Sequence, residues 1–554
     1  MDIAMLNSVI DEATPAYPSG LSKDEQFEFF CAEKLLTNYD VSYDEISDGI
    51  LDGTGDGGID AAYLFIDRRL VTDDFDFNTV GDDPFIELVL IQSKNTPSFS
   101  EVPVDKLHSV LNAFLFNTPT PTTLAAFKPE IADVFTKFQD ARAKISGKFP
   151  TVAVHAFYCA RAMAPATSVV GKADALKTAL TALYPASTVE LAGIPRLYEL
   201  AKEQKNLVIA LPTVGQPLTV TRAMVGLVRL ADFAKFISDD HGLIINRIFE
   251  SNVRDYQGDV EVNKEIAGSL TPGTTTEFWW MNNGVTIVAD KAQYVHPNIM
   301  IKNPLIVNGL QTSFEIHGKS AELTGDTRNV MIKIIEETDQ AEREKIIKAT
   351  NRQTAIKASS FRASDGIHVK IEDYLKSKGY FYDRRKNAYK RQGKPADRII
   401  SIDRMTQGVL SVHGQAPETA RARPGNALRN DTEYAAIFAE DADHPIAMYG
   451  VTTVLLTQIE AYFRSIRKTT DRVLVNNMKF HALMVLAWTL NGNSTLPGKR
   501  IAQLDPTNVT DAMLKKVTDW VFAEFTAAGA TDQIAREKAF TDRLRKNWTA
   551  AATA

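Results

Sequence analysis

Residues 55–67 read GDGGIDAAYLFID, and residues 85–94 read FIELVLIQSK. Each stretch contains an apolar run with the length of a buried strand, and the first run follows a glycine-rich turn. The turn places Asp60 at the start of its strand, where the carboxylate can project at the edge of a sheet. Because side chains alternate along a strand, Gln92 and Lys94 share one face of the second strand. The two stretches therefore predict an acid, an amide and a lysine at one end of a sheet.

This combination suits the hydrolysis of a phosphodiester bond. The reaction needs a neutralised phosphate, an activated water and a stabilised leaving oxygen, and Mg²⁺ held by carboxylates supplies all three. Acids in a glycine-rich turn commonly do no more than shape the turn, so an inert α/β domain is the alternative.

The two stretches resemble the Mrr-like branch of the PD-(D/E)XK nucleases, in which an Asp after a glycine-rich turn pairs with a Q-x-K or E-x-K strand. The resemblance covers roughly residues 20–100 and implies a restriction-endonuclease-like α/β fold with Mg²⁺, or Mn²⁺ in its place, as cofactor. It implies that Asp60 is a metal ligand, that Lys94 orients the attacking water, and that the Ser93 carbonyl faces the metal. Gln92 stands where the family more commonly has Glu.

As a catalytic residue and metal ligand, Gln92 binds Mg²⁺ more weakly than a carboxylate, so the site needs a further acid, which the family usually takes from its first helix. The helix predicted over 22–37 carries two candidates. A helical wheel places Glu28 on the apolar face and Glu33 nearer the polar boundary, so Glu28 is the favoured ligand. Glu87 is a weaker candidate, expected to be capping or solvated.

Amides cluster at turns in the central part of the chain. EFWWMNNGVTIVAD at 277–290 and NPLIVNGLQTSFEI at 303–316 are predicted strands with amides at a turn, and KATNRQTAIKASSFRASD follows at 348–365. Clustered amides are costly unless their donors and acceptors are used. They either order a structural turn or recognise a base, nucleotide or phosphate, and the residues alone leave both interpretations open.

These stretches, with FESNVRDYQG at 249–258 before them, are similar to the AIPR family, named for abortive infection and phage resistance. The similarity runs through about residues 240–420 and implies a bacterial defence protein. The family's NGQQT box reads NGLQT here, with Leu310 in place of an amide. The box also resembles the DGQ boxes of ParB-like proteins, some of which bind nucleotides. A nucleotide or nucleic-acid site is therefore a hypothesis for five side chains: Asn308, Gln311, Thr312, Asn351 and Gln353.

One local segment is strongly basic. Residues 380–398, YFYDRRKNAYKRQGKPADR, carry seven basic residues against two acidic ones, interleaved with aromatic residues. The segment is either a solvated charged surface or a site for phosphate contacts with aromatic stacking. The candidates for nucleic-acid binding are Arg384, Arg385, Lys386, Lys390 and Arg391.

The periodicity predicts a multidomain α/β protein with α/β domains at 1–205 and 206–425 and a helical region at 426–554. The two resemblances imply that the first domain is nuclease-like, of the PD-(D/E)XK type, and that the second is AIPR-like. Further strands are expected at 151–160, 188–193 and 329–337. Expected helices lie at 101–116, 122–146, 171–184, 222–239, 339–350, 448–466, 473–490, 510–527 and 530–548.

Composition sets limits on these domains. A chain of 554 residues exceeds what one core supports, and its net charge of −7 means that any phosphate-binding surface is local. Two cysteines, Cys31 and Cys159, cannot build a disulfide framework and are expected to pack in the interior. The N-terminus has no basic signal region, and HALMVLAWTL at 481–490 is expected to be a buried helix segment. We expect a cytoplasmic protein that does not enter a membrane.

The leading hypothesis is a Mg²⁺-dependent endonuclease acting on DNA in anti-phage defence. The alternatives are a nucleotide- or nucleic-acid-sensing protein with an inactive nuclease fold, and a nuclease that cleaves RNA. DNA is the expected partner. A homo-oligomer and a second defence-system protein stay open as further partners.

Overall fold

The chain, seen here in a computed structural model, forms two compact units. Unit 1 comprises Met1–Pro15, Leu21–Val71 and Asp76–Ile356, and unit 2 comprises Ala16–Gly20, Thr72–Phe75 and Lys357–Ala554. The structure describes residues 3–39, 41–51, 57–73, 75–81, 83–117, 127–205, 207–239, 242–249, 266–271, 274, 276–351, 366–384, 386–422, 424–439, 441, 443–467 and 469–549.

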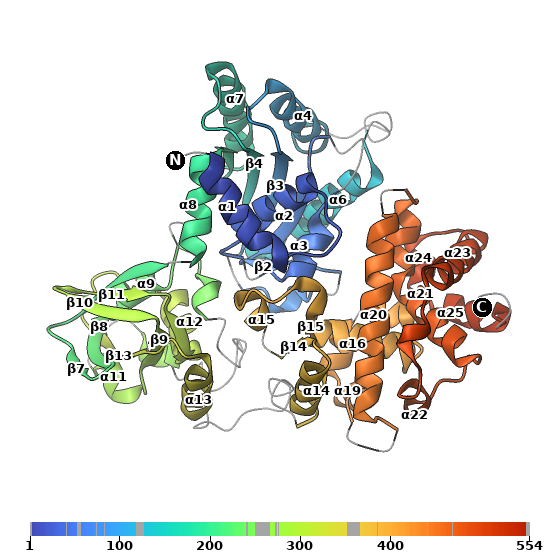
Figure 1. Cartoon of the computed structure of the whole chain (residues 1–554). Helices are drawn as coiled ribbons and strands as arrows, with labels where there is room; N and C mark the ends of the chain where they lie inside the picture. The colour runs from blue at the N-terminus through green and yellow to red at the C-terminus, as the bar shows by residue number, and fades with distance from the viewer. Residues whose placement is uncertain are drawn as a thin grey trace. The chain divides into compact units, whose positions relative to one another are not determined.

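A five-stranded sheet in the order β2-β1-β3-β4-β5 forms the first part of unit 1 (Figure 1). β1 is antiparallel to both β2 and β3, whereas β3, β4 and β5 run parallel. The strands predicted for AAYLFI, FIELVLIQSK and TVAVHAFYCA are confirmed residue for residue. The bounds are β1 Ala61–Ile66, β2 Arg69–Leu70, β3 Phe85–Lys94, β4 Thr151–Ala160 and β5 Thr188–Ala192. β3 is the central strand and is buried from Ile86 to Ser93, which explains its nearly continuous apolar sequence.

Helices pack around this sheet in two groups. α1, α2 and α8 pack together, with α2 also on β3, whereas α4 packs on α7 and β4. α2 begins with a capping box, in which the Ser22 hydroxyl accepts from the Glu25 N–H and the Glu25 carboxylate accepts from the Ser22 N–H. The bounds are α1 Ile3–Ala13, α2 Lys23–Leu35, α3 Tyr43–Gly49, α4 Glu101–Leu111, α6 Pro129–Lys144, α7 Thr167–Leu183 and α8 Ile194–Lys205.

Two further sheets lie in unit 1, one in the order β10-β11-β6 and one in the order β12-β9-β13-β8-β7. In the second, β9 and β13 are parallel and the other neighbours are antiparallel. The bounds are β6 Val208–Pro212, β7 Leu218–Val220, β8 Ala223–Arg229, β9 Val285–Ala289, β10 Lys291–Val295, β11 Asn298–Lys302, β12 Leu305–Asn308 and β13 Asn329–Glu336. Two helices follow these strands, α12 Leu310–Gly318 and α13 Gln340–Asn351, and α13 confirms the helix predicted at 339–350.

The helix predicted at 222–239 is wrong over its first half. Ala223–Arg229 form β8, and only Leu230–Phe236 are helical, as α9. β8 pairs with β13 along its whole length, so hydrogen bonds to a strand a hundred residues away override the local pattern. In the stretch predicted as one strand at 277–290, Phe278–Met281 form the short helix α11, and the strand begins only after Gly284.

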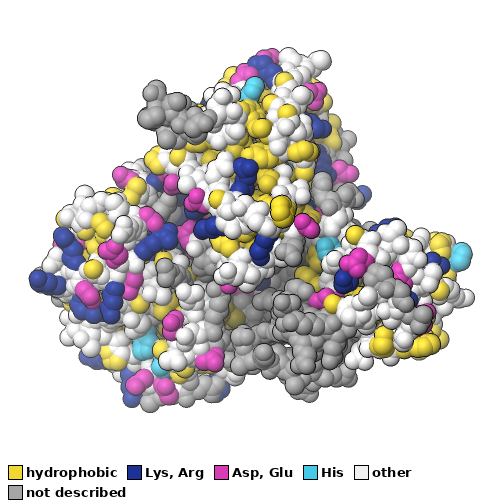
Figure 2. Space-filling model, turned by 180° about the vertical axis from the view of Figure 1, so that it is seen from behind, with side chains coloured by type: hydrophobic (Ala, Val, Ile, Leu, Met, Phe, Trp, Pro, Cys, Tyr) yellow, Lys and Arg dark blue, Asp and Glu magenta, His cyan; other side chains and the backbone are white. Residues whose placement is uncertain are grey.

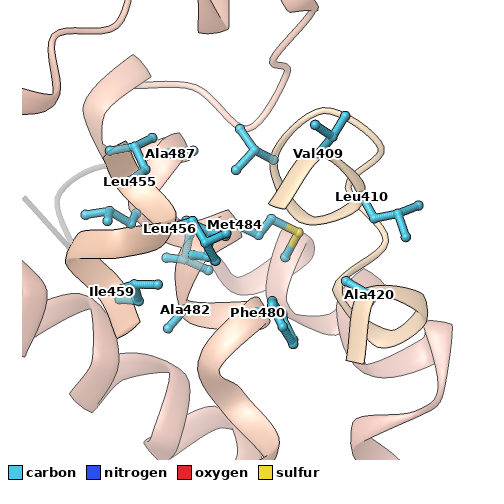
Figure 3. Close-up of a cluster of buried hydrophobic side chains, with 14 of the residues drawn as sticks. Val409, Leu410, Ala420, Leu455, Leu456, Ile459, Phe480, Ala482, Met484 and Ala487 are labelled. Atoms are coloured by element: carbon cyan, nitrogen blue, oxygen red, sulfur yellow. The ribbon is translucent and has the colours of Figure 1, made fainter. Parts of the chain in front are cut away.

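Unit 2 is mainly helical around one hydrophobic core (Figure 3). α16 Ile402–Val412, α20 Ile446–Ile466 and α21 Arg472–Asn491 pack on one another and line this core, and α23 Asp511–Ala528 packs on α21. α20, α21 and α23 confirm three predicted helices. The core draws residues from Ile367 to Leu544, on both sides of the boundary predicted at 425, and the three-domain division stays a prediction.

The helix predicted at 530–548 is two helices, α24 Asp532–Ala535 and α25 Lys538–Asn547. Glu537 between them has an extended backbone, and the buried residues Ala535 and Phe540 lie on either side of this break. Among the described residues, α21 alone has the length and hydropathy to cross a membrane, but 67% of that apolar window is buried. Burial of this kind is typical of a core helix, and residues 481–488 of the segment predicted to be buried are buried.

Candidate active site

Asp60 lies immediately before β1, beside the end of β3. Its N–H donates to the Ile91 carbonyl over 2.8 Å, and its own carbonyl accepts from the Leu51 N–H over 2.7 Å. These backbone bonds place the side chain next to the last residues of β3. The residue is only 6% exposed, so its carboxylate needs partners that compensate for lost hydration.

Three consecutive residues of β3 provide those partners at one oxygen, Asp60 Oδ2. Gln92 Nε2 donates to it over 2.9 Å and the Ser93 N–H over 2.6 Å, while Ser93 Oγ lies 3.3 Å away. Lys94 Nζ lies 3.5 Å from the same oxygen. The Lys94 side chain is 43% exposed against 9% for the Asp60 side chain. The lysine thus stands at the solvent side of a buried carboxylate, and the three side chains predicted to meet do so.

The turn before Asp60 needs two glycines for conformation and for space. Gly57 and Gly58 have backbone φ angles of +62° and +81°, which residues other than glycine rarely adopt. A Cβ on Gly57 would lie 2.0 Å from Val110 Cγ2, and one on Gly58 would lie 2.5 Å from Gln92 Oε1. Helix α4 therefore approaches the backbone of the turn at a distance that only glycine permits.

Gln92 is fully buried, and its Oε1 atom has no hydrogen-bond partner within the described part of the chain. A buried carbonyl oxygen without a donor is unfavourable by about 1–3 kcal/mol. The amide donates to Asp60 through Nε2, so a turn of the amide by 180° would bring Oε1 to the carboxylate instead. That orientation is favourable only with a cation between the two oxygens.

The two candidate acids of α2, Glu28 and Glu33, are arranged differently from the helical-wheel prediction. Glu33 is the buried one, at 6% exposure, and its carboxylate pairs with Lys34 Nζ over 2.7 Å, whereas Glu28 is half-buried. The wheel fails because α2 is enclosed by α1, α3, α8 and β3 and so has more than one buried face. Glu28 nevertheless acts on the same thiol as Asp60: burial, the Cys159 thiol and the charges of Glu28 and Asp60 together raise the pKa of Cys31. Both cysteines are free and buried, as predicted.

Among the described residues, no three His, Cys, Asp or Glu side chains are grouped closely enough to hold a metal ion. Mg²⁺ commonly takes only one or two carboxylates and keeps several waters. Asp60 and, with its amide turned, the Gln92 oxygen fit such a site, and Glu28 on the neighbouring helix acts on the same thiol as Asp60. The residues present therefore fit Mg²⁺ held mainly by one carboxylate and neutral oxygens.

The expectation that Glu87 is solvated is wrong, because it is fully buried in an ionic cluster. Its Oε1 accepts from the Tyr39 hydroxyl over 2.8 Å and lies 3.4 Å from Arg68 and from His155 Nε2. Arg68 also pairs with Asp239 over 2.7 Å. The sequence signal missed here is an arginine in the tight β1–β2 turn, followed by a lone acid inside an apolar strand.

The central amides have mostly internal partners. Asn308 Nδ2 donates to the Thr350 carbonyl over 2.7 Å, and Thr312 Oγ1 lies 3.1 Å from the Asn282 amide nitrogen. Gln311 Oε1 is buried without a partner among the described residues. The Asn351 side chain and all of Gln353 lie outside the described residues.

The basic segment is only partly available for a ligand. Arg384 Nε pairs with Glu372 over 2.5 Å, and the same carboxylate accepts from the Tyr389 hydroxyl over 2.8 Å. Lys386 is exposed and Lys390 is half-buried, while Arg385 and the Arg391 side chain lie outside the described residues. On the face drawn in Figure 2, basic and acidic side chains are interspersed among the described residues.

The AIPR protein family matches residues 249–552, more than half of the chain, and the chain belongs to this family. The match includes the C-terminal helices, so the extent of about 240–420 predicted from the motifs is too short. It begins in unit 1 and continues through unit 2. No curated protein and no solved structure matches the chain. The family suggests a role in abortive-infection phage defence.

Proposed function

We propose that the chain is a Mg²⁺-dependent endonuclease that hydrolyses phosphodiester bonds of DNA, with a restriction-endonuclease-like domain of the Mrr type at residues 1–205. The observation that carries this proposal is the convergence of Gln92, Ser93 and Lys94 on the buried Asp60 carboxylate. The charged partner of this carboxylate is a partly exposed lysine, which can also reach a substrate. The order of β1, β3 and β4, antiparallel then parallel, agrees with the proposed domain.

Each residue has a role in this reaction. Asp60 and the Gln92 amide oxygen would hold Mg²⁺ or Mn²⁺, assisted by Glu28 and the Ser93 carbonyl. The bound ion supplies Lewis-acid polarisation of the phosphate and a water of lowered pKa. Lys94 Nζ is placed to position the attacking water and to stabilise negative charge that develops on the phosphate. The backbone bond between Asp60 and Ile91 keeps the carboxylate and the lysine in register.

The test is cleavage of plasmid DNA, linear DNA, single strands and tRNA by the purified full-length protein. Cleavage is expected with Mg²⁺ or Mn²⁺ and not with EDTA. Asp60→Asn and Lys94→Met should each lower the rate by roughly 100-fold or more. The matched controls Asp174→Asn and Lys177→Met, both exposed on α7, should cleave like the wild type. Undiminished cleavage by both site variants refutes the assignment, and cleavage of tRNA alone makes RNA the substrate.

In this proposal the nuclease acts in the cytoplasm of an infected bacterium, and residues 206–554 restrain it until infection. A second copy of the chain or another defence-system protein is the proposed partner in that control. Phage should multiply poorly in cultures that carry the wild type, and cultures that carry Asp60→Asn should lose this protection. Equal protection by both would favour a sensing protein whose nuclease fold is inactive.

Nucleotide sensing by the central amides is a second candidate function, and Gln311 is the observation that favours it. Its Oε1 is a buried acceptor with no partner among the described residues. Thr312 beside it contacts Asn282, which ends helix α11, and Trp280 of this helix is 66% exposed. An exposed indole and an unpaired amide oxygen suit a nucleobase. Calorimetric titration with ATP and GTP tests this candidate: binding lost in Gln311→Ala supports it, and a wild type that binds neither excludes it.

A further inference from the structure

Helix α4 presents a lysine to the turn that carries Asp60. A Cβ on Gly58 would lie 2.8 Å from Lys106 Cβ and 3.3 Å from Lys106 Cδ, and only 2.5 Å from Gln92 Oε1. The aliphatic stem of Lys106 therefore packs over Gly58, beside the amide of Gln92. Val110, one turn later on α4, packs in the same way over Gly57. The stem of Lys106 is thus anchored at the candidate site.

The charge of Lys106 is not neutralised by the acids on its own helix. Asp105 and Glu101 both pair with Lys172 of α7, over 2.6 Å and 2.9 Å. Lys106 itself is exposed and makes no ion pair with any described residue. A lysine commonly packs its stem on the protein and keeps its ammonium in water. Among the described residues, no acid therefore competes with an anion from solution for this cation beside Gln92.

We infer that Lys106 binds a backbone phosphate of the polynucleotide next to the one that is cleaved. This inference rests on the proposed nuclease function. Lys94 and Lys106 come from two elements, β3 and α4, and both flank the Asp60–Gln92 pair. A single phosphate needs only one of these lysines, whereas a polynucleotide carries a phosphate at every nucleotide. Lys106 is thus a substrate-binding residue that favours a polymer over a mononucleotide, and Lys94 acts at the reacting phosphate.

The experiment compares the full-length wild type with Lys106→Met, Lys106→Arg and the control Lys177→Met. Binding of a fluorescent 20-nucleotide DNA duplex is followed by anisotropy in EDTA across a range of NaCl concentrations. Cleavage of the same duplex with Mg²⁺ gives kcat and KM. Replacing one phosphate contact should lower the slope of log K against log salt by about 0.9. Affinity should fall roughly two- to fivefold, the loss expected for an exposed ion pair.

For Lys106→Met we expect this smaller salt slope, a KM raised roughly two- to fivefold and a kcat within about twofold of the wild type. Lys106→Arg should restore the salt slope, and Lys177→Met should not change it. If the wild type binds and cleaves the duplex but Lys106→Met keeps its salt slope and KM, this inference alone is overturned. If the wild type neither binds nor cleaves any polynucleotide, the proposed function fails and the inference fails with it.

Discussion

Substitution of Gly58 by alanine tests whether the turn, the amide and helix α4 fit together as described. Gly58 has φ of +81°, and a Cβ there would lie 2.5 Å from Gln92 Oε1 and 2.8 Å from Lys106 Cβ. The left-handed backbone costs a residue other than glycine about 1–2 kcal/mol. The two short contacts add about 1–3 kcal/mol, as overpacking does elsewhere in folded proteins. Gly58→Ala should therefore lower the free energy of unfolding by about 2–5 kcal/mol.

Gly325→Ala is the matched control, because Gly325 has φ of +83° and no atom within 4 Å of the added Cβ. Gly325→Ala should lower the free energy of unfolding only by the backbone contribution of about 1–2 kcal/mol. Both variants are compared by urea unfolding followed by far-UV circular dichroism, since every tryptophan lies after residue 278 and none reports on the first sheet. The double variant Gly58→Ala/Gln92→Ala should be less destabilised than the two single effects added together, because the 2.5 Å contact is gone. Equal losses for Gly58→Ala and Gly325→Ala would refute the packing argument.

Three further predictions concern the buried charges. Gln92→Glu should tighten Mn²⁺ binding roughly tenfold in calorimetric titration, because a second carboxylate replaces an amide, and unchanged affinity would count against the metal site. Arg68→Met should lower the stability of unit 1 by about 3–5 kcal/mol, since it removes the arginine that pairs with the fully buried Glu87 and with Asp239, whereas the exposed neighbour Arg69→Met should cost much less in the same urea titration. Burial and the nearby charge of Arg421 lower the pKa of His481 to about 3. Below about pH 6.5 His481 is therefore protonated in the unfolded chain but stays neutral in the folded chain. The free energy of unfolding falls by up to about 1.4 kcal/mol per pH unit toward pH 3, and His481→Gln should flatten this pH dependence.

The position of β3 can be predicted from sequence because it is a long apolar run with no competing helical period, whereas the order of the strands comes from the structure. The stretch at 222–239 cannot be predicted in this way, since Ala223–Arg229 becomes a strand only through pairing with β13. Local propensity is weak compared with the hydrogen bonds of a sheet, and a single sequence does not say which strands pair. The division at 530–548 is missed for a similar reason, because the break at Glu537 serves the packing of the helical core.

The candidate site also divides into features that follow from local sequence and features that depend on tertiary packing. The side-chain alternation of β3 and the glycine turn suffice to predict that Gln92 and Lys94 reach Asp60. The burial of Glu33 rather than Glu28 depends on four elements that enclose α2, and a helical wheel assumes only one buried face. Lys106 enters the site from α4, and only the close approach of that helix to Gly58 reveals it.

The sequence by itself therefore determined the membership in the AIPR family, four of the five strands of the first sheet, and the meeting of Asp60, Gln92 and Lys94. These features depend on residues close together along the chain or on strand periodicity. The tertiary structure alone decided which acid is buried, that Glu87 lies in an ionic cluster with Arg68 and Asp239, and that Gln92 Oε1 has no donor among the described residues. Burial and charge pairing depend on which elements surround a side chain, and that arrangement exists only once distant segments have packed together.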